Sequence, residues 1–270
     1  MSAPITELDA LLHDLHDVHG YDLREYSRPS LERRVQKVMS TGKINSLDEL
    51  RKKLKDKQYI QQFIEEITVN VTEMFRDFTF FKFIRESVLP QLATYPFIRI
   101  WHAGCATGEE IYSMAILLEE AGLLERSLLY ATDLNLSVLE KAKNGRYPSH
   151  DIEASIENYR LTGGKEDFHK YYTTEGKFVE FSGHLRKNVV FAMHNLVTDK
   201  SFNEFNLIIC HNVLIYFNKN LQNKVIGLFY DSLAMFGYLS LGKTGTLTFS
   251  PHSSSFKGID KERRIWQKIQ

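Results

Sequence analysis

The fold is decided by residues 99–120, which read Arg-Ile-Trp-His-Ala-Gly-Cys-Ala-Thr-Gly-Glu-Glu-Ile-Tyr-Ser-Met-Ala-Ile-Leu-Leu-Glu-Glu. An apolar strand candidate, residues 97–101, leads into a turn of small residues. A helix with an apolar stripe follows over residues 109–121. A strand, a glycine-bearing turn and a helix N-terminus together predict a nucleotide-binding corner, because small residues let the backbone approach a ligand.

Two features of this corner depart from a phosphate-binding site. The spacing from Gly104 to Gly108 is not G-x-G-x-x-G. Glu109 and Glu110 also place two negative charges at the helix start, where a pyrophosphate would otherwise bind. A nicotinamide-dependent dehydrogenase, which must bind a dinucleotide, is therefore disfavoured. A cationic or neutral nucleoside fits the two carboxylates better.

The composition excludes several classes of protein. The 270 residues hold 34 Lys and Arg against 34 Asp and Glu, so the formal net charge is zero, which argues against a bulk nucleic-acid binder. Cys105 and Cys210 are too few for a disulfide scaffold, and we expect free thiols in a reducing compartment. No apolar run is of signal-peptide type or long enough to span a bilayer, so we expect a cytoplasmic protein without membrane insertion. The histidines show no metal-ligand spacing, so no metal is expected.

The pattern of apolar residues along the sequence changes near Pro96. Residues 1–78 read as a helical N-terminal domain and residues 79–96 as a linker helix. Beyond them, strands alternate with helices, which predicts an α/β domain over residues 97–270 with a doubly wound, mostly parallel sheet. The strand candidates are 97–101, 128–132, 189–192, 207–210 and 238–241, and the helix candidates are 109–121, 137–144 and 221–235. Residues 171–188 alternate in short runs and predict a small antiparallel subdomain inserted before the third core strand.

Polar residues fall at the ends of these elements. Asp133 follows the second strand, where an acid can accept both ribose hydroxyls of a nucleoside; a helix N-cap is the alternative role. His211 and Asn212 end the fourth strand and would face the crevice outside the strand ends. Tyr216 follows one helical turn later. From spacing alone, the alternative that Tyr216 and Phe217 are core aromatics is favoured.

A further polar cluster precedes the linker helix. Asn70, Thr72 and Arg76 lie together at the helix entrance. Without further context, the favoured interpretation is a capped helix with a surface arginine.

Residues 237–244, Gly-Tyr-Leu-Ser-Leu-Gly-Lys-Thr, formally satisfy the phosphate-loop pattern G-x-x-x-x-G-K-[ST]. A phosphate loop needs a turn between a strand and a helix. Here residues 238–241 read as the strand itself, and the segment that follows cannot begin a good helix. We therefore reject a phosphate loop.

In this order, the motifs resemble those of the CheR-type chemotaxis receptor methyltransferases, which are protein-glutamate O-methyltransferases. The resemblance covers nearly the whole chain and implies an all-α N-terminal domain ahead of a class I, Rossmann-like methyltransferase domain with an inserted antiparallel subdomain. It rests on Asn-Val-Thr-Glu-Met-Phe-Arg (70–76), Trp-His-Ala-Gly-Cys-Ala-Thr-Gly-Glu-Glu (101–110), Tyr-Ser-Met-Ala (112–115), Ala-Thr-Asp (131–133), Asn-Leu (195–196) and Cys-His-Asn-Val-Leu-Ile-Tyr-Phe (210–217).

The resemblance implies S-adenosylmethionine as cofactor and S-adenosylhomocysteine as product. By motif position, the residues that would contact the cofactor are Asn70, Thr72, Arg76, Gly104, Glu110, Asp133, Asn195, Leu196, His211 and Asn212. Arg76 and Tyr216 would also lie at the methyl-transfer centre. A sulfonium tolerates nearby acids, and a substrate glutamate is already ionised at neutral pH, so the enzyme mainly has to align the reacting groups.

The implied partners are the acidic methylation helices of chemoreceptors, and we expect the enzyme to act as a monomer. A basic run on one predicted helix is the candidate docking surface: Arg33, Arg34 and Lys37 share a face at helical spacing. A solvated charged face is the alternative.

Three positions depart from the family pattern. His211 stands where the family usually has Arg, and Gly-Lys-Thr-Gly (242–245) replaces Gly-His-Ser-Glu. The loop Thr-Thr-Glu-Gly (173–176) is short, which predicts independence of a receptor's C-terminal pentapeptide. Because segment 242–245 is altered, an alternative function stays open: a signalling homologue that binds S-adenosylmethionine without methylating receptors.

Overall fold

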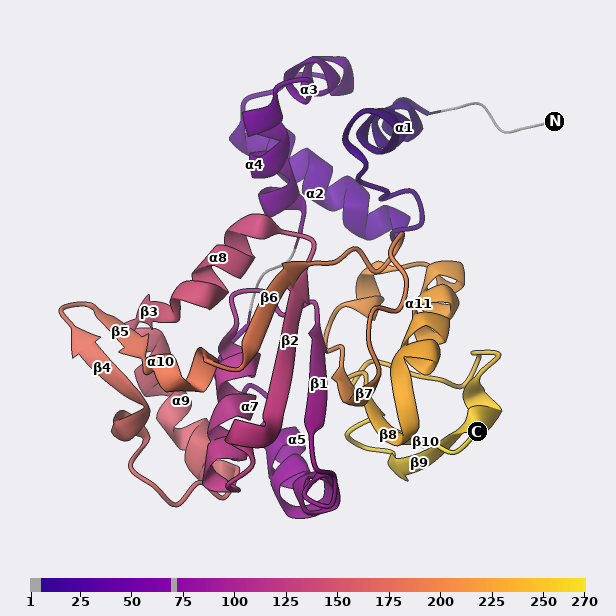
Figure 1. Cartoon of the computed structure of the whole chain (residues 1–270). Helices are drawn as coiled ribbons and strands as arrows, with labels where there is room; N and C mark the ends of the chain where they lie inside the picture. The colour runs from indigo at the N-terminus through magenta and orange to yellow at the C-terminus, as the bar shows by residue number, and fades with distance from the viewer. Residues whose placement is uncertain (1–5, 69–71) are drawn as a thin grey trace.

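The computed structural model describes residues 6–68 and 72–270. Four helices, drawn at the top of Figure 1, form the N-terminal part: α1 (Glu7–His19), α2 (Arg28–Thr41), α3 (Leu47–Lys53) and α4 (Lys57–Ile67). They bury their own apolar cluster, which includes Leu11, Leu50 and Phe63. The predicted all-α N-terminal region is confirmed.

A helical run connects these helices to the sheet. It consists of α5 (Phe78–Phe83), a π-helical turn (Ile84–Val88) and α6 (Leu89–Leu92). Asp77 begins it, because its side chain accepts a hydrogen bond from the Phe80 amide. No helix within the described residues is long and apolar enough to cross a membrane.

A seven-stranded sheet forms the centre of the remaining chain, in the order β6-β2-β1-β7-β8-β10-β9. Its first five members run parallel, as predicted for a doubly wound sheet: β6 (Val189–Met193), β2 (Ser127–Asp133), β1 (Ile98–Ala103), β7 (Phe205–Ile209) and β8 (Leu233–Ser240). The antiparallel strands β10 (Ile265–Lys268) and β9 (Phe256–Asp260) complete the sheet. This C-terminal pair was not predicted.

The sheet is covered on both faces, which buries its central strands. Ile98 and Ile100 of β1 face the cluster that holds α7 (Glu109–Glu120), whereas Trp101 and Ala103 face the cluster that holds α11 (Lys219–Ser232). Alternate residues of a strand point to opposite faces, so one strand serves both clusters. Figure 1 shows α7 and α11 on opposite sides of β1.

The small antiparallel sheet is larger than predicted. Its order is β3-β5-β4, with β4 (Tyr172–Glu175) and β5 (Phe178–Phe181) inside the expected range 171–188. The third strand, β3 (Arg146–Pro148), lies outside that range and pairs antiparallel with β5. Around it lie three helices, α8 (Leu136–Asn144), α9 (Ser149–Leu161) and α10 (Gly183–Arg186), of which only α8 was predicted.

Several predicted boundaries are wrong. The linker helix expected over 79–96 ends at Leu92, and the strand expected over 238–241 begins at Leu233. The helix expected over 221–235 ends at Ser232, and residues from Leu233 belong to β8. The reason is pairing, because Leu233 is already in register with Phe205 of β7. The rejection of a phosphate loop is confirmed, since β8 runs through Tyr238 and Ser240 and residues 241–252 contain no helix.

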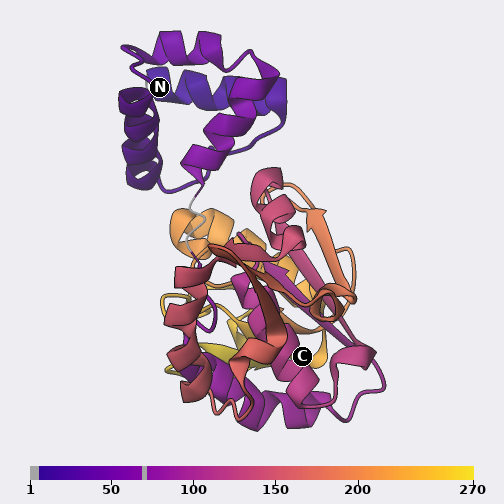
Figure 2. The same ribbon diagram turned by 90° about the vertical axis from the view of Figure 1, so that its left-hand side faces the viewer.

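Backbone pairing joins the helical domain to the sheet domain beside the end of β7. Tyr26 forms an antiparallel bridge with Phe217. The Ser27 amide donates to the Tyr216 carbonyl at 2.7 Å, and the Asn218 amide donates to the Glu25 carbonyl at 2.9 Å. Figure 2 shows the helical domain standing above the sheet domain.

Candidate functional site

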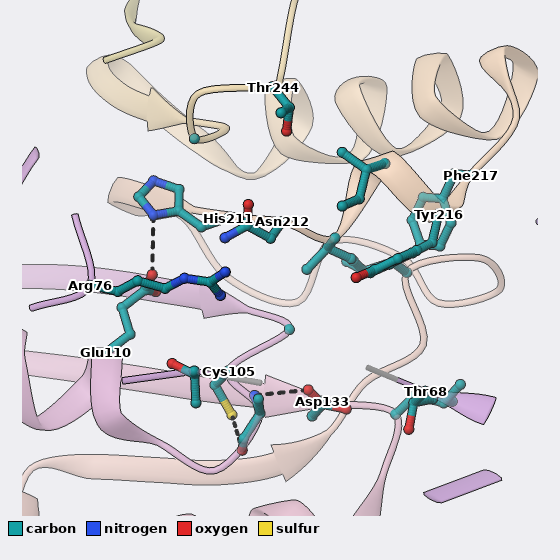
Figure 3. A pocket seen from close by; sticks show the side chains of 18 of the residues that line it. Thr68, Arg76, Cys105, Glu110, Asp133, His211, Asn212, Tyr216, Phe217 and Thr244 are labelled. Atoms are coloured by element: carbon teal, nitrogen blue, oxygen red, sulfur yellow. Dashed lines mark hydrogen bonds and ion pairs between the residues drawn. The ribbon is translucent and has the colours of Figure 1, made fainter. Parts of the chain in front are cut away.

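A cavity of about 480 Å³ lies at the carboxyl ends of β1, β2, β6 and β7, beneath the helical domain. Its size is typical of small-molecule sites. The predicted site residues that line it are Thr72, Arg76, Gly104, Glu110, Asp133, Asn195, Leu196, His211, Asn212 and Tyr216. Asn70 lies outside the described residues. Figure 3 shows that the side chains of Arg76, Glu110 and Asp133 reach the cavity from separate segments of the chain, as do those of His211, Asn212 and Tyr216.

The glycine turn after β1 is sterically required. Gly104 has φ +79°, and a Cβ built on it would lie 2.4 Å from Cγ2 of Val213. The amides of Gly104 and Cys105 both donate to the Thr132 carbonyl, at 2.8 and 2.9 Å. Any side chain at position 104 would therefore press on the loop that carries His211 and Asn212.

Asp133 is held at the end of β2 by backbone donors. Its Oδ2 accepts from the Ala106 amide and its Oδ1 from the Asn135 amide, both at 3.0 Å. The helix cap is Asn135, whose Oδ1 accepts from the Ser137 amide, so the N-cap alternative for Asp133 is wrong. Burial raises the pKa of Asp133. A carboxylate has about four lone-pair directions, which leaves acceptors for two ligand hydroxyls.

Glu110, in the first turn of α7, lies between two histidines. Its Oε1 is 2.7 Å from Nδ1 of His102, and its Oε2 is 3.2 Å from Nδ1 of His211. Burial acts to raise the pKa of Glu110, but the two neighbouring imidazoles, His211 first, hold it below the ordinary value. The ring of His211 lines the cavity, and both of its nitrogens have protein partners, the second being Ser240 Oγ at 2.8 Å.

Arg76 reaches the cavity from a constrained loop. The preceding residue, Phe75, has φ +53°, and its amide donates to Ser113 Oγ at 2.9 Å. The Ser113 hydroxyl in turn donates to the Glu109 carbonyl, which ties this loop to α7. The Phe75 ring is buried against Phe81. Arg76 itself is exposed, and its guanidinium points toward Asn212 in Figure 3.

Tyr216 and Phe217 both line the cavity; Phe217 is also a buried member of the core, and Tyr216 is half-buried against it, so the core-aromatic alternative holds fully for Phe217 and only in part for Tyr216. The guanidinium of Arg34 lies 4.3 Å from the centre of the Tyr216 ring, within cation–π range. Its Nη1 donates to the Ile67 carbonyl at 2.5 Å. Arg34 is only 9% exposed. The expectation that Arg34 shares a solvent-facing docking surface is therefore wrong, because its side chain points inward, while Arg33 and Lys37 are exposed.

Several lining residues were missed from the sequence. Tyr26, His194, Lys243 and Thr244 all face the cavity. His194 is 8% exposed, packs at 5.2 Å from the Trp101 ring, and has an Nδ1 without a hydrogen-bond partner in the described part of the chain. A sequence signal existed for Arg34, since it falls on the apolar face formed by Leu31, Val35 and Val38. None existed for Tyr26.

The cavity is suited to a nucleoside that carries a positive charge. Of the residues that the structure describes, four carboxylate residues line it against three cationic ones, and of the two acids next to the glycine turn, Glu110 and Asp133, the pKa of Glu110 is held below its ordinary value. An opposite charge stabilises such a buried anion, whereas a phosphate would be repelled. The unpartnered Nδ1 of His194 is a further polar atom that a ligand could satisfy.

Comparison with protein families gives two matches. The model described as "CheR methyltransferase, all-alpha domain" matches residues 6–68. The model described as "CheR methyltransferase, SAM binding domain" matches residues 70–264.

Curated proteins show the same likeness. The "Putative methyltransferase Cher3" of Pseudomonas putida is 43% identical over 97% of this chain and 96% of its own length. The "Chemotaxis protein methyltransferase" of Listeria monocytogenes is 32% identical over 83% of each chain. Among solved structures, N-methyltransferase NodS of Bradyrhizobium japonicum aligns with 74% of this chain and 90% of its own, at 13% identity and a TM-score of 0.41, a likeness too weak to carry an argument.

Proposed function

The chain belongs to the CheR methyltransferase family, whose cofactor is S-adenosylmethionine, and from that premise we propose that it methylates glutamate side chains of chemoreceptors. Relatives with the name "Chemotaxis protein methyltransferase" support a role in chemotaxis. The observation that carries the proposal is the cavity, which gathers Arg76 and Tyr216 beside the carboxylates of Glu110 and Asp133.

We assign a role to each group of lining residues from its chemistry. S-adenosylmethionine supplies a methyl group on a positively charged sulfur. In the proposal, Glu110 binds the ammonium of the methionine part, and Asp133 accepts the ribose hydroxyls. Asn195, Leu196 and His194 line the cavity in the loop after β6 and would contact the adenine. Thr72, Gly104 and Asn212 complete the wall.

The substrate carboxylate needs little activation. The ordinary pKa of glutamate is about 4.3, so the nucleophile is ionised at neutral pH and no general base is required. Arg76 would orient that carboxylate through its fork of donors. Tyr216 would donate one hydrogen bond and keep the oxygen in line with the methyl group. Such alignment can account for much of the barrier reduction.

The test is methyl transfer to receptor-containing membranes with methyl-labelled S-adenosylmethionine. Ester formation is read as base-labile label. We expect Tyr216→Phe to lower kcat at least about tenfold while the affinity for S-adenosylhomocysteine changes less than about threefold, because the hydroxyl faces the substrate. Receptors with the target glutamates changed to alanine should take up no label. Full kcat in Tyr216→Phe would contradict the role of Tyr216.

A second candidate function rests on residues 242–245. Lys243 stands at the position where the family usually carries a histidine. It lines the cavity, and its Nζ lies 3.6 Å from Oδ2 of Asp77. The altered segment, which lacks the family's histidine and acid beside the cavity, is what favours a homologue that binds the cofactor without methylating receptors. The same assay separates the two functions, because tight binding of S-adenosylhomocysteine without label on any receptor supports the binding homologue.

A further inference from the structure

We propose that His102 is a positioning residue that, together with His211, holds the Glu110 carboxylate in place for the ammonium group of the cofactor. The inference rests on the proposed function, since it assumes that Glu110 binds that ammonium. His102 does not line the cavity, and it would act only through Glu110.

His102 occupies a place where packing alone favours an apolar residue. It is fully buried in β1, the central strand, and its cross-strand partners are Ala131 and Ile209. It lies two residues after Ile100 and so shares that residue's face of the sheet, which packs on α7. Its side chain therefore points at the first turn of α7, where Glu110 lies.

One hydrogen bond accounts for a polar side chain at this position. Nδ1 of His102 is 2.7 Å from Oε1 of Glu110. Its Nε2 is buried and has no hydrogen-bond partner among residues 6–68 and 72–270. A buried polar atom without a partner destabilises the fold. A leucine would avoid that cost, so the contact with Glu110 is the feature that distinguishes histidine here.

His211 holds the other oxygen of the same carboxylate. Its Nδ1 lies 3.2 Å from Oε2 of Glu110, and its Nε2 lies 2.8 Å from Ser240 Oγ. When the Ser240 hydroxyl donates to Nε2, the neutral ring carries its proton on Nδ1 and donates to Glu110. Ser240 is fully buried, so the far side of the His211 ring is held inside the protein while the ring itself lines the cavity.

The two histidines fix both the rotamer and the charge of Glu110. Oε1 has His102 as its hydrogen-bond partner and Oε2 has the His211 ring 3.2 Å away, and each oxygen keeps a lone pair for a further donor. The pKa of Glu110 is held below its ordinary value, so this buried carboxylate carries a negative charge that calls for balance by a cation. A cofactor ammonium would complete that balance, whereas an uncharged ligand would gain nothing from it.

The test compares two ligands that differ by the amino-acid part. S-adenosylhomocysteine carries the ammonium, and 5′-methylthioadenosine lacks it. Calorimetric titration of the full chain with each ligand is repeated for His102→Leu, which removes the donor at similar volume, and for His102→Asn, whose amide nitrogen can stand near the Nδ1 position. We expect His102→Leu to weaken S-adenosylhomocysteine about tenfold and 5′-methylthioadenosine less than about twofold. His102→Asn should restore most of the loss.

Each other outcome has a definite meaning. An unchanged affinity of His102→Leu for S-adenosylhomocysteine overturns the inference. Equal weakening of both ligands, without rescue by His102→Asn, also overturns it, because that pattern indicates general damage to the corner. A wild-type chain that binds S-adenosylhomocysteine but labels no receptor contradicts the proposed function and leaves this inference standing.

Discussion

Two adjacent glutamates show how neighbours decide the charge of a side chain. Burial raises the pKa of Glu109 to about 7, and the hydroxyl of Thr107 at 2.7 Å only partly opposes this. Glu110, one residue later, is held below its ordinary pKa by two imidazoles. The sequence shows the pair of acids but not this difference, because His102 and His211 meet Glu110 only in the fold.

The raised pKa of Glu109 makes stability depend on pH. The pKa of Glu109 is about 7 in the folded chain against an ordinary 4.5, so the protonated form of this carboxyl stabilises the fold. This contribution to the unfolding free energy is complete below pH 4.5 and is lost as the pH rises through 7. Glu109→Gln stays neutral and can still accept from Thr107. It should therefore be more stable than the wild type near pH 8, by about 2 kcal/mol, and differ little near pH 4.5.

Urea unfolding of both chains at the two pH values measures the effect. The difference between the chains isolates Glu109, because other titrating groups are common to both. A stability difference that is the same at both pH values would show that Glu109 does not titrate near neutrality.

At the scale of elements, the buried parallel strands could be predicted because each reads as a short apolar run. β9 and β10 could not, because Phe256 and Ile265 are buried while most of their strand neighbours are exposed or only half-buried. Asp133, His211 and Asn212 could be placed at one edge of the sheet because they follow parallel strands. His102 lies within a strand and Tyr26 in a distant loop, so no spacing rule pointed to them.

The backbone hydrogen bond between Ser27 and Tyr216 leads to a prediction about how the helical domain positions Tyr216. The Ser27 amide donates to the Tyr216 carbonyl at 2.7 Å, and Ser27 has φ −57°, which suits proline. Ser27→Pro therefore removes this one donor without backbone strain. We expect a loss of about 1 kcal/mol in unfolding free energy and a several-fold lower methyl-transfer rate, because Tyr216 is less firmly placed.

Ser27→Ala is the matched control. It keeps the amide donor, and the Ser27 side chain makes no capping hydrogen bond, so its kinetics should match the wild type. A rate in Ser27→Pro equal to that of Ser27→Ala would show that this pairing does not position Tyr216.

At the scale of the whole molecule, the cavity is closed by both domains. Tyr26, Arg34 and Thr68 come from the helical domain, residues 72–81 contribute from the connecting segment, and the remaining wall comes from the sheet domain. The chain connects the two domains, and the pairing at Ser27 and Tyr216 connects them a second time. Receptor binding on the helical domain would therefore act directly on the geometry of the reaction site.

Arg33 and Lys37, exposed four residues apart on α2, remain the proposed docking surface. Glu32 does not neutralise it, since Glu32 pairs with Arg28 at 3.0 Å. Arg33→Glu with Lys37→Glu should raise the KM for receptor at least about tenfold at low salt and leave the affinity for S-adenosylhomocysteine unchanged. The difference from the wild type should shrink as salt is added, because exposed charges are screened.

Lys257→Glu with Lys261→Glu is the control for net charge, since both lysines are exposed near the C-terminal strands, far from α2 in Figure 1. An equal rise in KM for this control would mean that overall charge, and not a docking surface on α2, governs receptor recognition.

The contact between Trp101 and His194 also gives the protein an optical signal. The chain has two tryptophans, and one of them, Trp101, packs against His194, which lines the cavity. Its indole is fully buried and donates to Thr132 Oγ1, so its emission should be blue-shifted. A ligand that satisfies the open nitrogen of His194 would change the quenching of that emission, so that loading of the cavity can be followed in real time without a label.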